Sequence, residues 1–339
     1  MNGAAPVGEA GSTAFVVLSG FGPVGQAYAC RLTEARLDGA RLRLAAVRTS
    51  AAQWTASTDD PTAPPHPPRG PLAPLGQTLE RTGAAILVQA LPSTPEVRDL
   101  AAAEAVTALR AGVHVVTAAK AHLLSAWREL EAAAHTGGAL IRLSAATGAA
   151  LPAGDLARFG VRGFGCRSVR ACLNGTSTFV LDRMAGGGSL ADALSEARRL
   201  GIAEGDPSAD LAGRDAVTKA ALLAALLWGW DASAVRWCTE PIGEAAAGAA
   251  RAAAARGRRL RAVASAAADT PHEVRVLLEE TAPGDPMHAL IGPEKAVTFE
   301  CPETGDVTVS GGRSSPLGAA LAMLKDSLDV VADGRRGFR

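Results

Sequence analysis

A glycine-rich turn near the start of the chain constrains the fold most strongly. Residues 14–19, AFVVLS, form a short apolar run, and the segment GFGPVG follows it directly. In such a turn Gly20 permits a tight bend, Gly22 lets a pyrophosphate approach the backbone, and Gly25 allows a helix to pack closely on the strand. The amides of a helix starting near Pro23 would hold the anion. The pattern predicts a dinucleotide site formed by Gly20, Phe21, Gly22, Pro23, Val24 and Gly25.

Strand-like and helix-like segments alternate over the first 145 residues. The expected strands are 42–47, 84–91, 113–118 and 139–145, and the expected helices are 95–111 and 123–136. The proline-rich stretch 56–76 is typical of an irregular surface loop. This alternation predicts an α/β fold with a doubly wound parallel sheet, which binds ligands at the carboxyl ends of its strands. Lys120 follows such an end, so we expect it to face the cofactor.

The end of the second expected strand indicates which dinucleotide is bound. A cofactor without a 2′-phosphate usually meets Asp or Glu there, whereas this chain has Arg48, Thr49 and Ser50. A cation and two hydroxyl groups suit a 2′-phosphate. The sequence therefore favours NADP over NAD, with NAD possible, and the alternative is that Arg48 is an ordinary surface arginine.

The pattern changes after Pro152. The expected elements are a strand over 169–173, helices over 178–185 and 189–200, two strands over 259–266 and 272–280, and a last helix over 317–332. These segments predict a second α/β domain with an open, mixed or mostly antiparallel sheet. Two domains also agree with the length of 339 residues, which exceeds a usual single core.

The stretch 200–219, LGIAEGDPSADLAGRDAVTK, combines an acidic loop with the start of an apolar helix. Asp215 and Lys219 are four residues apart and share one face of that helix. An exposed Asp–Lys pair is common and contributes little to stability. However, the helix from about Leu211 to Gly229 is rich in Ala and Leu, and charges on a buried helix need a reason. A solvated surface loop and a functional site both remain open at this point.

The composition excludes several classes of protein. Formal charges cancel to zero, which argues against nucleic-acid and anionic-membrane partners. Five dispersed cysteines fit a reducing compartment, and none of the six histidines has metal-ligand spacing. The N-terminus lacks the pattern of a signal peptide, and the longest apolar run is too short to span a membrane. We therefore expect a cytoplasmic protein without a bound metal.

With these motifs in order, the chain resembles the homoserine dehydrogenase family over most of its length. The family signature of Gly, Glu and Asp-Pro followed by Asp and Asp-x-x-x-Lys is present as 201–207, GIAEGDP, with Asp210, Asp215 and Lys219. The Asn-Gly-Thr segment of the family is present at 174–176, and its Val-Thr-Ala-Asn-Lys strand end appears at 116–120 as VTAAK. Several ordered motifs are more specific than any one of them.

The resemblance implies NAD(P)-dependent interconversion of L-aspartate 4-semialdehyde and L-homoserine, with a small amino aldehyde or amino alcohol as substrate. It also implies a Rossmann-type domain over 1–145, a catalytic and dimerisation domain over 146–312, and a C-terminal helix within 313–339 that returns to the first domain. A homodimer is expected. The length leaves no room for the further regulatory domain that some relatives carry.

The resemblance also assigns roles to the site residues. Lys219 and Lys120 flank the same substrate oxygen, and either could donate the proton. Lys219 is the favoured donor, Asp215 holds it, and Lys120 also contacts the cofactor. The expected substrate contacts are Glu204 to the ammonium group, Gly175 and Thr176 to the carboxylate, and Asp210 to the loop or the amine.

Three positions depart from the family pattern. Family members usually have Asn where this chain has Ala119, an aromatic residue where it has Ile202, and a Glu associated with a monovalent cation where it has Ser144. These departures leave three hypotheses open. The chain is a homoserine dehydrogenase or a relative acting on another amino aldehyde, a nucleotide-binding protein without turnover, or a different dehydrogenase with a similar first domain.

Overall fold

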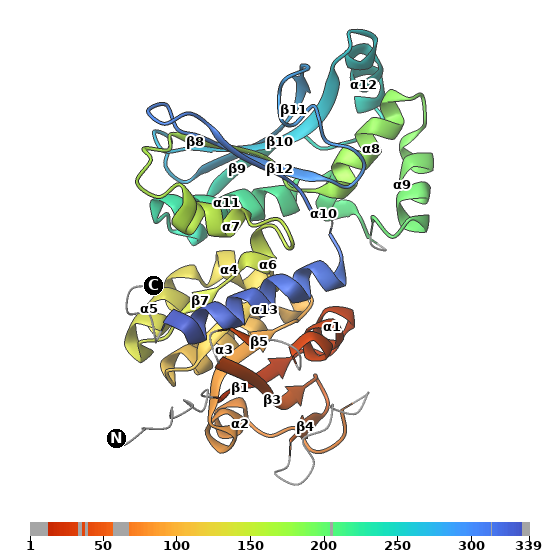
Figure 1. Ribbon diagram of the computed structural model, residues 1–339. Coiled ribbons are helices and arrows are strands. Elements are labelled where there is room, and N and C mark those ends of the chain that lie inside the picture. Colours follow the sequence, from red (N-terminus) through yellow and green to blue (C-terminus); the bar gives the residue numbers. More distant parts are fainter. Residues whose placement is uncertain are drawn as a thin grey trace, which may run out of the picture. The chain divides into compact units, whose positions relative to one another are not determined.

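The computed structural model describes residues 13–32, 36–37, 40–56, 68–203, 206–312 and 314–333. It forms two compact units. Unit 1 is Met1–Ala119, Glu129–Arg142 and Met323–Arg339, and unit 2 is Lys120–Arg128 and Leu143–Ala322. Each unit has its own sheet (Figure 1).

The sheet of unit 1 is mainly parallel. Its strands are β1 (Thr13–Ser19), β2 (Arg36–Leu37), β3 (Ala40–Arg48), β4 (Gln53–Thr55), β5 (Ala84–Gln89), β6 (His114–Thr117) and β7 (Ile141–Arg142). They lie in the order β2-β3-β1-β5-β6-β7, and β2 and β4 run antiparallel to β3. The parallel strands after β1 lie on both of its sides, so the end of β1 is the topological switch point at which such sheets bind dinucleotides. The prediction of a Rossmann-type parallel sheet is confirmed.

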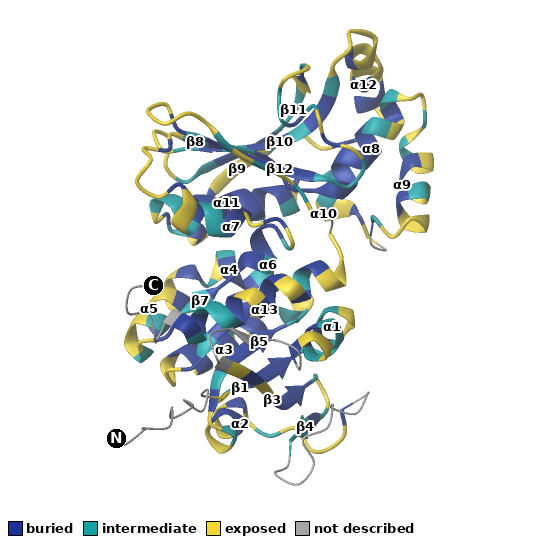
Figure 2. Ribbon diagram, in the orientation of Figure 1, coloured by how far each residue is buried: buried dark blue, intermediate teal, exposed yellow. Residues whose placement is uncertain are grey.

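The helices of unit 1 follow the expected alternation. They are α1 (Pro23–Leu32), α2 (Leu75–Thr82), α3 (Pro95–Arg110), most of α5 (Trp127–Gly137), and α13 (Pro316–Asp333) from Met323 onward. The central strands are apolar and fully buried, which is typical of a parallel sheet covered on both faces (Figure 2). The hydroxyl groups of Tyr28 on α1 and Ser327 on α13 are hydrogen-bonded at 2.8 Å, which joins the end of the chain to this unit.

Three local predictions in this region differ from the structure. The strand expected over 139–145 is only β7, because the backbone turns into the short helix α6 (Ser144–Thr147). The helix expected over 123–136 is divided into α4 (Ala121–Ser125) and α5. Helix α2, which starts at the end of the proline-rich stretch, was not predicted because that stretch has no apolar period.

The sheet of unit 2 is mostly antiparallel, as predicted. Its strands are β8 (Ser168–Cys172), β9 (Arg236–Thr239), β10 (Arg259–Ala267), β11 (Glu273–Thr281), β12 (Lys295–Glu300) and β13 (Val307–Gly311). They lie in the order β13-β12-β8-β10-β11-β9. Among the described strands of this second sheet, only β11 and β9 pair in parallel. Strands β9, β12 and β13 were not predicted.

Helices cover one face of this second sheet. Besides α4 and α6, unit 2 contains α7 (Ala153–Asp155), α8 (Gly175–Ala185), α9 (Leu190–Arg199), α10 (Ser208–Leu211), α11 (Arg214–Trp228) and α12 (Ala246–Ala255), a π-helical turn at Leu156–Gly160 and a 3₁₀ turn at Ala232–Ala234. Leu260 of β10 packs in a cluster with α8 and α12. On the same face of the sheet, Ala264 of β10 pairs with Ala171 of β8, which packs with Leu223 of α11.

Helix α11 is largely buried (Figure 2). It is nevertheless too short to cross a bilayer. Across the ranges that the structure describes, no helix has the length and apolar character of a membrane span.

Candidate active site

Helix α11 places two charged side chains on one buried face. It begins after Gly213, whose φ of +75° is accessible to glycine and whose added Cβ would lie 3.2 Å from Cγ1 of Val276. The expected start at Leu211 is therefore wrong, since α10 ends there and the chain turns before α11. Asp215 lies in the first turn and Lys219 one turn later, so their side chains meet.

Asp215 pairs with two lysines at once. Its Oδ2 lies 2.6 Å from Nζ of Lys219, and its Oδ1 lies 3.0 Å from Nζ of Lys120, the residue that caps α4. The side chains of Asp215 and Lys219 are each 11% exposed, and that of Lys120 is 28% exposed. The alternative of a solvated surface pair is therefore wrong, because the structure buries the carboxylate between the two ammonium groups.

The electrostatics of this cluster follow from its geometry. Burial alone would raise the pKa of Asp215, but the charges and hydrogen bonds of Lys219 and Lys120 outweigh it and hold that pKa well below its usual range. Asp215 is thus a permanent carboxylate at neutral pH. It holds two positively charged groups close to one point, which is where a developing negative oxygen would be stabilised.

Asn174 connects this cluster to the neighbouring elements. Its side-chain oxygen caps α8 by accepting from the amide of Ser177 at 2.9 Å. Its amide nitrogen donates to Oδ1 of Asp210 at 2.6 Å and to Oδ2 of Asp215 at 3.0 Å. Sequence reasoning identified the Asn-Gly-Thr segment but gave Asn174 no role. The helix-capping residue ahead of α8 was the signal that could have found it.

Lys219 is fixed by two oxygens. Besides Asp215, its Nζ donates to the carbonyl oxygen of Leu173 at 2.8 Å, directly after β8. An ammonium group has three N–H bonds, so two are used within the described residues and the third can donate to a substrate.

Some of the predicted substrate-binding residues belong to the described part of the chain. These lie near the end of β8, close to Lys219. Thr176 is buried on α8 and donates from Oγ1 to the carbonyl oxygen of Ile202 at 3.3 Å. Gly175 allows a close approach, because an added Cβ would lie 2.6 Å from the carbonyl oxygen of Pro293. Ile202 itself packs beside Phe179. Glu204, the predicted contact of the substrate ammonium group, lies outside the described residues.

In unit 1 the glycine-rich turn has the shape that a pyrophosphate needs. Gly20 has φ +94°, and a Cβ there would lie 2.4 Å from the carbonyl oxygen of Ala90. A Cβ on Gly25 would lie 2.3 Å from the carbonyl oxygen of Gly20, whereas a Cβ on Gly22 would meet nothing within 4 Å. Helix α1 begins at Pro23. The turn is therefore closed where it packs and open where an anion would approach its amides.

Phe21 and Val24 complete this turn. The carbonyl oxygen of Phe21 accepts from Nε2 of Gln26 at 2.9 Å, which ties the turn to the first turn of α1. Val24 is half-buried. These two residues shape the loop.

Arg48 lies at the end of β3, but it is not a surface arginine. It is 6% exposed, and its Nη1 donates to Oε1 of Gln53 at 2.6 Å, the carbonyl oxygen of Ala73 at 2.8 Å and Oγ1 of Thr78 at 3.0 Å. Burial lowers its pKa, and the charge of Glu104 raises it. Within the described part of the chain, Nη2 makes no hydrogen bond. The guanidinium group therefore has a structural role, and any contact with a 2′-phosphate would be an additional one.

Thr49 closes the turn after Arg48. Its Oγ1 accepts from the amide of Ala52 at 3.1 Å and donates to the carbonyl oxygen of the same residue at 3.1 Å. The hydroxyl group thus stabilises the bend between β3 and β4.

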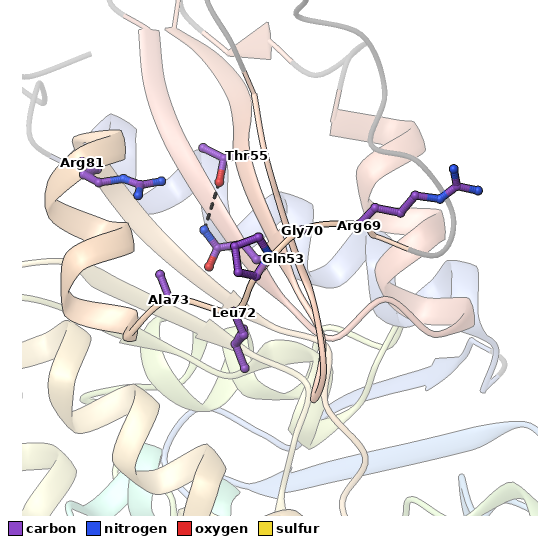
Figure 3. Close-up of a pocket in the computed structure, with 8 residues that line it drawn as sticks. Gln53, Thr55, Arg69, Gly70, Leu72, Ala73 and Arg81 are labelled. Carbon is purple, nitrogen blue, oxygen red and sulfur yellow. Dashed lines mark hydrogen bonds between the residues drawn. The ribbon is translucent and has the colours of Figure 1, made fainter.

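A small open pocket of unit 1 lies beside β4 (Figure 3). It has a volume of about 290 Å³ and is lined by Gln53, Thr55, Arg69, Gly70, Pro71, Leu72, Ala73 and Arg81. The side chain of Gln53 connects this pocket to Arg48. Its Oε1 accepts from Arg48, and its Nε2 donates to Oγ1 of Thr55, also in the pocket wall, at 2.9 Å. None of the predicted site residues lines this pocket. No group of three His, Cys, Asp or Glu residues that could hold a metal occurs in the described ranges.

Departures from the family pattern have local explanations. Ser144, at the position of the cation-associated Glu, donates from Oγ to Oδ1 of Asp155 at 3.2 Å. Ala119 is fully buried, and its amide donates to Oγ1 of Thr117. The Ser144 side chain therefore links α6 to α7, and the Ala119 amide closes the turn after β6.

Comparison with known proteins identifies relatives of this chain. The family model described as homoserine dehydrogenase matches residues 152–328, which is more than half of the chain. Homoserine dehydrogenase of Corynebacterium glutamicum is 39% identical over 149 residues, which cover 44% of this chain and 33% of that protein. Homoserine dehydrogenase of Methanocaldococcus jannaschii is 34% identical over 154 residues, which cover 45% of this chain and 46% of that protein. These matches thus span less than half the length of either relative.

A longer match and two solved structures extend the comparison. The NAD(+)-dependent homoserine dehydrogenase of Pseudomonas canavaninivorans is 27% identical over 260 residues, 76% of this chain and 74% of that protein. A crystal structure of a homoserine dehydrogenase homologue from Archaeoglobus fulgidus has a TM-score of 0.80 at 23% identity and covers 94% of this chain and 99% of that chain. A hyperthermophilic archaeal homoserine dehydrogenase in complex with NADPH has a TM-score of 0.76 at 22% identity, covering 95% and 98%. The two structures show that the fold is shared.

Proposed function

This chain belongs to the homoserine dehydrogenase family, and we propose that it is an NAD(P)-dependent oxidoreductase that interconverts L-aspartate 4-semialdehyde and L-homoserine. The observation that carries the proposal is the buried Lys120–Asp215–Lys219 cluster. It combines a proton donor with a permanent carboxylate and a second cation.

The cluster supplies what reduction of an aldehyde needs. A bound dihydronicotinamide supplies the hydride to the aldehyde carbon. The electron pair of the C=O π bond then moves to the oxygen, which becomes an alkoxide and needs a proton and a nearby positive charge. Lys219 donates that proton through its third N–H bond. Lys120 stabilises the same oxygen, and Asp215 holds both ammonium groups in place.

The substrate amino acid provides two further charged groups. We assign its ammonium group to Glu204 and its carboxylate to the amides after Asn174, with Thr176 and Gly175. Asp210 supports this arrangement through its hydrogen bond with Asn174. The family membership supports the assignment of all four residues, and the position of Gly175, Thr176 and Asp210 near one strand end supports theirs.

The glycine-rich turn of unit 1 fits the pyrophosphate of a nicotinamide dinucleotide. Gly20, Gly22, Pro23 and Gly25 provide its backbone, and Phe21 and Val24 shape the loop. An NADPH complex and an NAD(+)-dependent enzyme both occur among the related proteins. We infer a preference for NADP, carried by Nη2 of Arg48 and by Thr49, and we place Lys120 beside the nicotinamide.

The second sheet supports a homodimer. Its helix-free face carries Leu277 and Arg275 of β11, next to an ion pair of Arg170 with Glu279 at 2.8 Å. A partly apolar sheet face of this kind is suited to pairing with a second copy. Light scattering at micromolar concentration is expected to give twice the chain mass, and a monomer would refute the dimer. No disulfide joins the cysteines of the described residues, which agrees with a cytoplasmic location.

The proposal is tested by following NADPH consumption with L-aspartate 4-semialdehyde. We expect turnover by the wild type and a loss of kcat of about 10²–10⁴-fold in Lys219→Met, because the variant lacks the proton donor. Lys325→Met removes a lysine outside the site and is expected to leave kcat unchanged. Full activity of Lys219→Met would refute its role, and no turnover of any amino aldehyde would refute the enzyme class.

A related substrate is the second candidate. Ile202 packs beside Phe179 at a position where the family usually carries an aromatic side chain, so the space around the substrate differs. A panel of amino aldehydes ranked by kcat/KM separates the two candidates. Tight NADP binding without hydride transfer to any of them would instead indicate a nucleotide-binding protein.

A further inference from the structure

Lys295 is a buried cation that the reaction described above does not use. It is the first residue of β12, is 1% exposed, and is one of the largest fully buried side chains of the described chain. Its Nζ donates to the carbonyl oxygen of Gly148 at 2.9 Å, and it forms no ion pair with any described residue. A buried ammonium group is costly unless it is well paired, so its presence needs an explanation.

The carbonyl that Lys295 contacts belongs to a tight turn. The oxygen of Gly148 also accepts from the amide of Leu151 at 3.2 Å. A Cβ on Gly148 would lie 2.4 Å from the carbonyl oxygen of Leu151, and the next residue, Ala149, has φ +54°. A left-handed backbone is unfavourable for alanine, so the turn needs contacts that hold it. The ammonium group of Lys295 provides one from the other side.

Lys295 also lies beside the reactive cluster. Strand β12 pairs with β8 through Ala296 and Cys172, which brings Lys295 to the strand end that continues into Leu173. The carbonyl oxygen of Leu173 is the one that Lys219 contacts. Two ammonium groups therefore hold carbonyl oxygens of neighbouring segments at one end of this strand pair.

The charged groups of the reactive cluster act on Lys295. Burial, followed by the charges of Lys219 and Lys120, lowers the pKa of Lys295 to about 7, while Asp215 opposes the shift.

We propose that Lys295 is a positioning residue that acts as a built-in monovalent cation: its ammonium group holds the Gly148–Pro152 turn beside the strand end at which Lys219 is fixed. This role deepens the proposed dehydrogenase function and rests on it for its effect on turnover. A lysine with a purely structural role would affect stability but would leave the pH dependence of the reaction unchanged.

Two substitutions separate the charge from the volume. Lys295→Ala leaves a space beside the Gly148 carbonyl that a small cation can enter, whereas Lys295→Met fills the space without a charge. Both variants are expected to lower kcat by about 10–100-fold, because a displaced turn disturbs the site. In both, the pH profile of kcat for aldehyde reduction should lose the change near pH 7 that the titration of Lys295 contributes in the wild type.

Rescue by free cations gives the sharper test. At constant ionic strength, ammonium or methylammonium is expected to restore part of the kcat and of the Tm of Lys295→Ala, while tetramethylammonium, which is too large, should not. Lys295→Met and the wild type should be indifferent to the choice of cation, and so should Lys325→Met. Unchanged kcat and pH profile in Lys295→Met would overturn the proposal, as would the absence of rescue in a folded Lys295→Ala.

The Tm measurement keeps this inference separate from the proposed activity. If the wild type failed to reduce any amino aldehyde, the dehydrogenase function would fall. A rise in the Tm of Lys295→Ala with ammonium but not with tetramethylammonium would still support the built-in cation, and identical Tm values in both salts would refute it.

Discussion

Arg48 in unit 1 and Lys219 in unit 2 are both buried cations, but their surroundings differ. Arg48 donates only to neutral oxygens, those of Gln53, Ala73 and Thr78. Lys219 donates to one carbonyl oxygen and to the carboxylate of Asp215, which a second ammonium group also contacts.

The difference separates a structural cation from a reactive one. Arg48 meets neutral partners through Nη1 alone; its guanidinium group stays protonated and joins β3 to β4 and α2. A shared carboxylate brings two amines together, and amines release protons far more readily than guanidinium does. The first arrangement stabilises a fold, whereas the second can transfer a proton.

Replacement of Asp215 is expected to have the largest effect. Asp215→Asn leaves the ammonium groups of Lys120 and Lys219 without their carboxylate, so kcat/KM should fall by at least about 10²-fold. The free energy of unfolding should fall by about 3–5 kcal/mol, because an ion pair that is mostly buried loses one partner. Steady-state kinetics and urea unfolding measure the two effects.

Asp206→Asn is the matched control for that variant. Asp206 is an exposed carboxylate of the same stretch, whose Oδ1 accepts from the amide of Ser208 at 2.9 Å. It should leave kcat/KM within a factor of about two, as expected for a surface position. If both variants lost activity equally, the distinction between a buried reactive cluster and its acidic loop would not hold.

Replacement of Arg48 is expected to have a smaller effect, and mainly on stability. Arg48→Met removes three hydrogen bonds from a buried network, in which Gln53 Oε1 keeps only the donor Thr78 Oγ1, and this should cost about 1–3 kcal/mol in the free energy of unfolding. Thermal unfolding measures this loss, and Arg69→Met, at an exposed position of the pocket in Figure 3, is the control.

Cofactor discrimination sharpens the result for Arg48. If Nη2 contacts a 2′-phosphate, Arg48→Met should raise the KM for NADP about tenfold more than the KM for NAD, the effect of one charged hydrogen bond. Equal changes in both KM values would leave Arg48 with its structural role alone and would remove the 2′-phosphate assignment.

Sequence patterns predicted those features that depend on neighbours along the chain. The strand before Gly20 and the helix after it were predictable because a glycine turn between apolar runs is a local pattern. The meeting of Asp215 and Lys219 followed from helical spacing. Tertiary pairing decided the rest. Arg48 is buried because β4 and α2 cover it. Lys295 contacts Gly148 because β12 pairs with β8.

The missed strands have the same explanation. Strands β9, β12 and β13 contain lysine, arginine, threonine and serine between their apolar residues. β9 pairs with β11 and β12 with β8, both distant in the sequence, and β13 then pairs with β12 at the edge of the sheet. Glu204 illustrates the other limit, since its role rests on the family signature and it lies outside the described residues.

The double use of Asn174 has a consequence for the chemical lifetime of the protein. An asparagine followed by glycine is the pair whose side-chain amide hydrolyses most readily in a flexible chain. Hydrolysis here would convert the donor to Asp210 and Asp215 into a third carboxylate, while leaving the cap of α8 intact. Such a change would alter the charge of the site while the fold remained intact. The hydrogen bonds that hold Asn174 therefore protect activity over time as well as arranging the site.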